Sequence, residues 1–256
     1  MSKTSHFIIL IGGPGTFESC DRDHDKTWKN YIVPIQVAVT KKQLAVSAGE
    51  TMQWWIYAPA YAERWVDDVA DIGNSKLDRG KELLDSRGRD ISNVRASQAT
   101  DYLDRIKRMA KSSNASFKAL KSVDDFWTEL QALPDHSVSR LWYIGHASEK
   151  GLMLKLVHDS KSCAPAAQAS DMVMVTDLAT RSGLIASKLA AKPDTSKFYG
   201  CFTKGFAEQW NTRFGSATEG TTTKIDFGLI DSASKIVPIL PRLEAGTDWK
   251  RFNARP

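Results

Sequence analysis

The residues best suited to chemistry in this sequence are one histidine and one cysteine, each of which follows a short apolar run. His146 follows RLWYIG and Cys201 follows KFYG. A thiol beside an imidazole can act as a nucleophile, because the imidazole takes its proton and later protonates the leaving group. The pair therefore suits acyl transfer. Cys201 would attack a carbonyl carbon, His146 would protonate the leaving amine, and water would then hydrolyse the acyl-enzyme.

The residues around this pair fit the same chemistry. Glycines precede both His146 and Cys201, and small residues let the backbone approach a substrate closely. A helix-like segment at 205–214 follows Cys201, so we expect the positive end of its dipole to lower the pKa of the thiol. The backbone N–H groups of Ala147 and Cys201 could hold an oxyanion. Taken singly, however, a free cysteine is often a packing residue and a loop histidine a surface residue.

The two motifs together resemble those of the caspase-like cysteine peptidases of clan CD, which include caspases, gingipains, separases and the self-cleaving domains of large bacterial toxins. Their pattern is a hydrophobic block before His-Gly, and a second hydrophobic block that ends in a small residue and Cys. The matching pieces are LWYIGHAS and KFYGC. The toxin-type members are the ones most similar to the segment FYGCFTKGFAEQWNTRFG, which is followed by SATEG. The resemblance covers about 116–220, and two earlier strands fit the same sheet.

This resemblance implies a caspase-like α/β fold, in which a central, mostly parallel sheet is flanked by helices. It implies a cysteine endopeptidase with Cys201 as nucleophile and His146 as general acid/base, acting on a protein or peptide. A bacterial effector or defence protease, switched on by an activating ligand or partner protein, is the implied role. Ala147 stands where the family has a glycine that lends an N–H to the oxyanion hole. A catalytically inactive, partner-binding module is therefore the first alternative.

Acidic residues near the strand ends could shape a substrate pocket. Asp21 and Asp23 follow the first predicted strand, where they could contact a basic substrate side chain or belong to a solvated loop. Their spacing is like the start of a calcium loop, but Lys26 and Ile32 replace the required Gly and Glu, so we predict no metal site. Glu219, in the strand after the Cys201 helix, could shape the pocket for the residue before the cleaved bond.

The second alternative is a polyanion-binding α/β protein. The glycines of IGGPGTF follow a strand but lack the spacing of phosphate-binding loops, so a turn is the better interpretation. Net charge is +5, yet basic residues alternate with acidic ones, which makes nucleic acid an unlikely partner. The local basic residues that could bind a polyanion are Lys76, Arg79, Lys81, Arg87, Arg89 and Arg95.

Alternating strands and helices are expected to position the pair. The continuous apolar run Phe7–Ile11 predicts a central parallel strand, and 52–58 predicts a second one, followed by a helix at 61–69. Such alternation gives a mostly parallel sheet whose sites lie at the carboxyl ends of its strands. The other predicted strands are 116–120, 140–145, 151–157, 172–175 and 197–200. The other predicted helices are one capped by Ser122 that ends before Pro134, one capped by Asp177 that runs to about Ala191, and 205–214.

Composition is that of an ordinary globular protein, with 42% hydrophobic and 25% charged residues. We expect a single domain over 1–256, with a polar insertion around 74–113 that becomes helical near its end. No apolar run is long enough to span a membrane, and the first residues indicate a strand rather than a secretory signal. We therefore expect a cytoplasmic protein, with export by another route left open. Three cysteines without Cys-x-x-Cys spacing indicate neither a disulfide framework nor a zinc site, and no cofactor is predicted.

Overall fold

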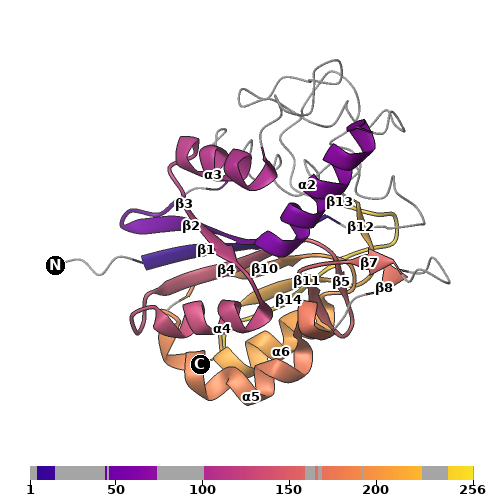
Figure 1. The fold of residues 1–256 in the computed structure, drawn as a ribbon. Helices are drawn as coiled ribbons and strands as arrows, with labels where there is room; N and C mark the ends of the chain where they lie inside the picture. The colour runs from indigo at the N-terminus through magenta and orange to yellow at the C-terminus, as the bar shows by residue number, and fades with distance from the viewer. Residues whose placement is uncertain are drawn as a thin grey trace.

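A seven-stranded sheet forms the centre of the computed structural model, which describes residues 5–14, 44, 46–73, 101–158, 165–166, 169–191, 193–226 and 242–255 (Figure 1). The strand order is β14-β11-β10-β4-β1-β2-β3. These strands are β1 (Ser5–Ile11), β2 (Glu50–Tyr57), β3 (Ser116–Leu120), β4 (Val138–Ile144), β10 (Ser196–Tyr199), β11 (Thr218–Thr221) and β14 (Trp249–Phe252). Neighbours are parallel except for β14, which pairs antiparallel with β11. The predicted mostly parallel α/β sheet is thus confirmed.

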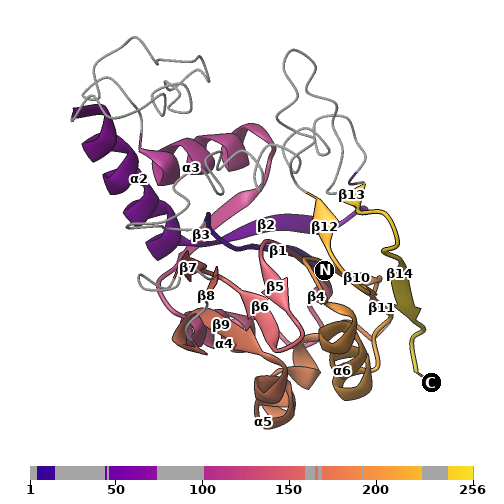
Figure 2. The same ribbon diagram turned by 90° about the vertical axis from the view of Figure 1, so that its right-hand side faces the viewer.

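Helices cover both faces of this sheet. Figures 1 and 2 show α2 (Ala58–Gly73) and α3 (Tyr102–Ser112) on one face, and α4 (Val123–Ala132), α5 (Val175–Ile185) and α6 (Lys204–Phe214) on the other. Short 3₁₀ turns lie at η3 (Ala169–Asp171) and η4 (Ala186–Lys188). Successive residues of β1 enter opposite cores, Ile9 toward α2 and α3 and Leu10 toward α4 to α6. A strand covered on both faces must be apolar throughout, which explains the run Phe7–Ile11.

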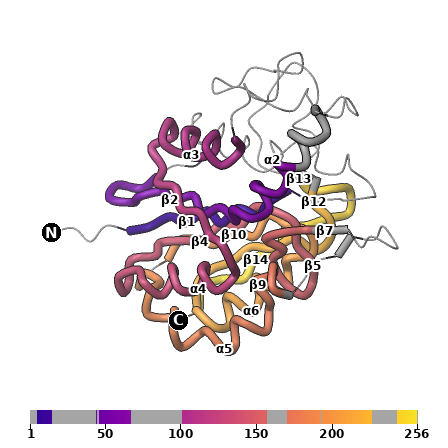
Figure 3. Tube along the Cα trace, in the orientation of Figure 1, coloured from indigo at the N-terminus to yellow at the C-terminus, as the bar shows by residue number. Residues whose placement is uncertain are grey.

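Three small antiparallel sheets lie apart from the central one. The first comprises β5 (Ala147–Ser148), β6 (Gly151–Met153) and β9 (Met172–Met174). The others pair β7 (Val157–His158) with β8 (Pro165–Ala166), and β12 (Ile225–Asp226) with β13 (Arg242–Leu243). Figure 2 looks onto the carboxyl end of the parallel strands and shows β5-β6-β9 and β12-β13 on opposite sides of them. In Figure 3, which draws the chain as a tube, the chain exits β4 and β10 at this same carboxyl end.

Most predicted elements are present with shifts of a few residues. Helix α3 lies near the end of the predicted insertion and buries Tyr102, Ile106 and Met109. The hydroxyl of Ser122 accepts the N–H of Asp125 at 3.0 Å as the predicted N-cap of α4. The part of the predicted insertion at 74–100 lies outside the described residues. No helix in the described part of the chain is long and apolar enough to cross a membrane.

Two predicted elements are wrong in extent. The strand predicted at 151–157 is divided between β6 and β7, which belong to different sheets. The helix predicted to start at Asp177 starts at Val175, and the Asp177 carboxylate accepts the N–H of Met174 at 2.9 Å. It also ends at Ile185 instead of continuing to Ala191. The 3₁₀ turn η4 follows, and the chain becomes extended at Leu189. The N–H of Ala190 then donates to the carbonyl of Val138 at 2.8 Å, so tertiary pairing overrides helical periodicity.

Candidate active site

His146 and Cys201 come together at the ends of adjacent parallel strands. In the pairing of β4 with β10, Ile144 lies opposite Tyr199, and the N–H of Gly145 extends the ladder by donating to the Tyr199 carbonyl at 3.1 Å. His146 and Cys201 each lie two residues beyond that pair. Because neighbouring strands are only about 5 Å apart, the register places the backbones of the two residues near each other.

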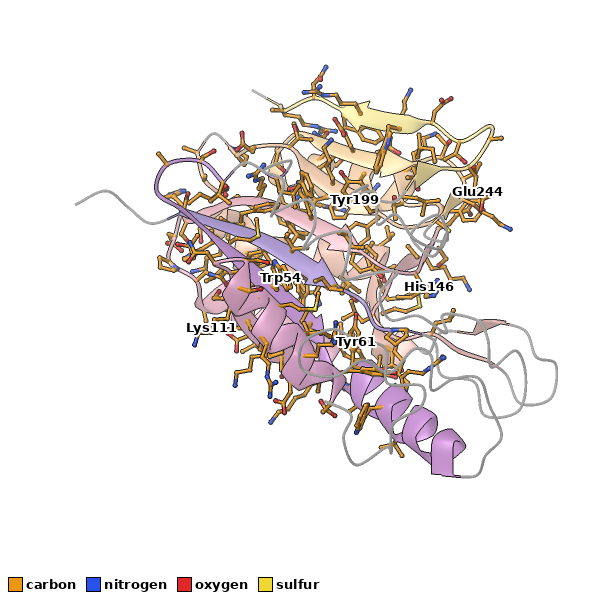
Figure 4. The ribbon with its side chains drawn as sticks, turned by 90° about the horizontal axis from the view of Figure 1, so that it is seen from above. Trp54, Tyr61, Lys111, His146, Tyr199 and Glu244 are labelled. Atoms are coloured by element: carbon orange, nitrogen blue, oxygen red, sulfur yellow. The ribbon has the colours of Figure 1, made fainter. Side chains whose placement is uncertain are left out.

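The face of the sheet is known for Cys201. Alternation along β4 and β10 places Trp142, Ile144 and Tyr199 on one face. All three of these residues belong to the core beneath α2 and α3, against which Cys201 packs. Figure 4, viewed from that side, shows His146 at the carboxyl edge. A nucleophile and its base must first lie at the same edge of the sheet, as these two residues do.

The Cys201 thiol is half-buried and points toward the β12–β13 pair. Its Sγ lies 3.9 Å from the carbonyl oxygen of Ile225, to which it donates a weak hydrogen bond. Burial raises the pKa of Cys201, and the charge of Glu244 raises it further while that of Lys224 lowers it. The thiol is therefore protonated at neutral pH in this structure.

This direction is opposite to the one predicted from the helix dipole. Helix α6 begins at Lys204, and its N-cap is Thr203 rather than Cys201. Because the field of a helix terminus falls off within about one turn, the cysteine gains little from it. Desolvation therefore dominates and raises the pKa of Cys201. The prediction of a lowered pKa is wrong for this conformation.

The turn that follows Cys201 is held firmly. The hydroxyl of Thr203 donates to the carbonyl of Phe198 at 2.7 Å, and the N–H of Phe202 donates to the carbonyl of Thr223 at 2.8 Å. Phe202 has φ of 58°, the left-handed region that bulky residues rarely adopt. Such outliers concentrate at functional sites, and this one adjoins the candidate nucleophile.

A buried tyrosine, which the sequence did not single out, holds the backbone of the histidine loop. The hydroxyl of Tyr143 contacts the carbonyl oxygens of His146 and, at 2.7 Å, Met153. The N–H of Met153 also donates to the His146 carbonyl at 2.8 Å. Burial raises the pKa of Tyr143 well above its usual value, so its hydroxyl remains a donor. These contacts fix the peptide that carries the imidazole.

Two backbone N–H groups are available for an oxyanion. Ala147 and Leu152 face each other in the β5–β6 hairpin, next to the pair in which the Met153 N–H donates to His146. Since hydrogen-bonded and non-hydrogen-bonded pairs alternate in antiparallel ladders, the N–H of Ala147 points away from β6. The N–H of Cys201 makes no hydrogen bond within the described residues. Ala147 is extended and buried, so an alanine fits here without strain.

The two glycines of the motifs are needed by the protein itself. A Cβ at Gly200 would lie 2.7 Å from the Ala147 Cβ and 2.9 Å from the Gly145 carbonyl oxygen. A Cβ at Gly145 would lie 2.5 Å from the Tyr143 hydroxyl. These three contacts are too short for real atoms. Gly200 therefore allows the two strand ends to approach each other, and Gly145 leaves room for the Tyr143 hydroxyl.

Of the acidic residues predicted for a substrate pocket, Glu219 lies in the described part of the chain, and it is paired within the sheet. Glu219 lies within β11 and forms ion pairs with Lys197, at 2.7 Å, and with Arg251, at 4.0 Å. Lys197 precedes Cys201 by four residues, or about 13 Å of extended chain. The Glu219 charge is thus compensated inside the sheet. Asp21 and Asp23 lie outside the described residues.

A pocket that the sequence did not predict adjoins the pair. It has a volume of about 480 Å³. The residues that line it are Ser148, Glu149, Lys150, Met153, Met172 and Phe202. They come from β5, β6, β9 and the turn after β10, which long-range pairing brings together, so periodicity could not reveal them.

The glycine loop after β1 is not open to a phosphate. The N–H of Gly12 donates to the Ile144 carbonyl at 3.0 Å, and that of Gly13 to the Leu154 carbonyl at 2.8 Å. A Cβ at Gly13 would lie 2.1 Å from that of Ala60, so helix α2 packs directly on the loop. The basic residues between Lys76 and Arg95 lie outside the described residues. Within the described ranges, no three metal-ligating side chains cluster.

Fold and site together define an α/β protein with a cysteine and a histidine at the carboxyl ends of adjacent parallel strands. Comparison of the sequence with protein-family models and with curated proteins gave no match. The functional argument therefore depends on geometry and chemistry at these two strand ends.

Proposed function

We propose that the protein is a cysteine endopeptidase of caspase-like architecture, in which Cys201 is the nucleophile and His146 the general acid/base. The register of β4 and β10 is the observation that carries this proposal, because both residues follow the strand ends at one edge of the sheet. The resemblance of LWYIGHAS and KFYGC to clan CD motifs supports it. An effector or defence protease that acts on proteins or peptides is the role that this resemblance favours.

The proposed reaction is acyl transfer in two steps. His146 takes the thiol proton while the Cys201 Sγ bonds to the scissile carbonyl carbon, and the oxyanion accepts hydrogen bonds from the N–H groups of Ala147 and Cys201. His146 then gives its proton to the leaving amine as the C–N bond breaks, which leaves a thioester. Water, deprotonated by His146, attacks the thioester and releases the acid and the free thiol.

In this conformation the Cys201 thiol is not activated for attack. The thiol is protonated and donates to the Ile225 carbonyl in β12. Attack on a substrate requires Sγ to leave this oxygen, so the substrate or an activating ligand must displace it. The same observation favours a second candidate, a catalytically inactive module that binds a partner through the caspase-like fold.

Affinity labelling separates these two candidates. We would treat the protein with tripeptidyl chloromethyl ketones, varied next to the ketone, and in parallel with iodoacetamide, and read the labelling of Cys201 by peptide mass spectrometry. A peptidase should label at least tenfold faster with the best peptide reagent than with iodoacetamide, since bound peptide aligns the electrophile. His146→Ala should remove this advantage.

The matched control is His136→Asn. His136 is an exposed histidine at the other end of the sheet with φ of 58°, a conformation that asparagine tolerates. It should leave both labelling rates unchanged. Equal rates for peptide and simple reagents, in wild type as in His146→Ala, would contradict the peptidase and favour the inactive module.

A further inference from the structure

We infer that the pocket beside the pair is a subsite for an apolar side chain, that of the first residue on the leaving-group side of the scissile bond. This inference rests on the proposed peptidase function and adds its substrate preference. Met153, Met172 and Phe202 line this pocket, and Ser148, Glu149 and Lys150 lie at its rim.

The base of the pocket is built from two paired methionines. Met153 lies directly opposite Met172 in the β6–β9 ladder, and the neighbouring pair Leu152 and Val173 is fully buried in the core. Because side chains alternate across a strand, the methionines point away from that core and into the pocket. Methionine is flexible and polarizable, so such a surface adapts to apolar side chains of several shapes.

The described lining of the pocket does not favour an ionised substrate side chain. Its charged residues among those described, Glu149 and Lys150, lie at the exposed hairpin tip and have opposite signs. An ionised substrate side chain would lose its water against the methionines without a dedicated counterion, which is costly. The volume of about 480 Å³ is within the range of ligand pockets. A large apolar side chain is therefore the best match.

The position of the pocket assigns it to the leaving-group side. His146 must come within hydrogen-bonding distance of the leaving nitrogen to protonate it. The rim of the pocket begins two residues after His146, at Ser148 in the β5–β6 hairpin. On the opposite side, the Cys201 thiol contacts Ile225 of β12. Figure 2 shows these two small sheets on opposite sides of the strand ends. The acyl part of a substrate should thus extend toward β12 and the amine part toward β5 and β6.

Digestion of a proteome-derived peptide library tests the assignment, with the new amino termini identified by mass spectrometry. For wild type we expect Leu, Met, Phe and Ile to be enriched several-fold as the first residue of the new termini. Met153→Glu should reduce cleavage before apolar residues about tenfold and favour cleavage before Lys and Arg. Leu184→Glu, at an exposed position of α5, is the control and should leave the preference unchanged.

A substrate with an anilide leaving group separates binding at this pocket from catalysis. Such a substrate has no amino-acid side chain after the scissile bond, so Met153→Glu should reduce its kcat/KM by clearly less than the tenfold loss expected for peptides with an apolar residue there. Met153→Gln provides a milder variant with the same expected direction if Met153→Glu does not fold. Wild-type cleavage without a preference after the bond, or a change confined to residues before it, would overturn the assignment. Absence of any cleavage by wild type, together with a Cys201 that does not react with peptide reagents, would instead contradict the proposed function.

Discussion

Opposing effects of its surroundings act on the pKa of Cys201 and therefore on its reactivity. Burial and Glu244 favour the neutral thiol, whereas Lys224 favours the thiolate. In the unfolded chain a cysteine has a pKa of about 8.5. The folded state therefore holds on to its proton at pH values where the unfolded state has already lost it, which links the state of this thiol to stability.

This linkage predicts a pH dependence with a definite sign. Because folding raises the pKa of Cys201, its contribution to stability is fully present below about pH 8 and is lost as pH rises through the folded value. The free energy of unfolding of wild type, measured in urea, should fall relative to that of Cys201→Ala between pH 8 and pH 10. A constant difference between the two proteins over this range would contradict a raised pKa.

The backbone of Phe202 gives a second prediction at the same scale. An L-residue in the left-handed region is disfavoured by roughly 1–2 kcal/mol, a cost that glycine avoids. Phe202→Gly and Phe202→Ala lose the same ring, so their difference reports the backbone alone. We expect the glycine variant to be more stable by about 1 kcal/mol, the reverse of the usual order in helices. Urea unfolding of both variants measures it, and a more stable alanine variant would count against the conformation.

Among the elements, those that bury a continuous apolar face could be predicted from the sequence. The run Phe7–Ile11 indicates a central strand because both of its faces need cover, and Ser122 with its acidic first turn indicates the start of α4. The small sheets could not be predicted, since strands of two or three residues have no measurable periodicity. The pocket could not be predicted either, because Met153 and Met172, which pair across β6 and β9, are distant in sequence.

The contact between the two strand ends gives a prediction about elements rather than single residues. Gly200→Ala would place a methyl group 2.7 Å from the Ala147 Cβ, so the two ends must separate. We expect a loss of roughly 1–3 kcal/mol in the free energy of unfolding, typical of overpacking, together with loss of Cys201 labelling by peptide reagents.

In the double variant with Gly200→Ala, Ala147→Gly should restore part of the stability and part of the Cys201 labelling. It removes the Ala147 methyl group, with which the added Cβ at position 200 clashes. The Gly145 carbonyl, 2.9 Å from the same added atom, limits the rescue. A double-mutant cycle should therefore give a coupling of about 0.5 kcal/mol or more. Strictly additive effects would mean that the strand ends do not touch.

For the whole molecule, the parallel topology explains where the site lies. Strands from near both ends of the chain, β1 and β14, belong to one sheet, and helices cover its two faces. The carboxyl edge of such a sheet is where parallel α/β proteins place their ligands. From the sequence, this rule predicts a site at His146 and Cys201. It could not predict the direction of the thiol or its pKa, because both depend on β12, which is distant in sequence.

The most direct test of the proposed peptidase is digestion of a proteome-derived peptide library by wild type, Cys201→Ala, His146→Ala and the control His136→Asn, with all new peptide termini counted. We predict cleavage by wild type and His136→Asn, none by Cys201→Ala, and a loss of at least a hundredfold in rate for His146→Ala. Cleavage that persists in Cys201→Ala, or wild type that fails to cleave and whose Cys201 also ignores peptide reagents, would contradict the account.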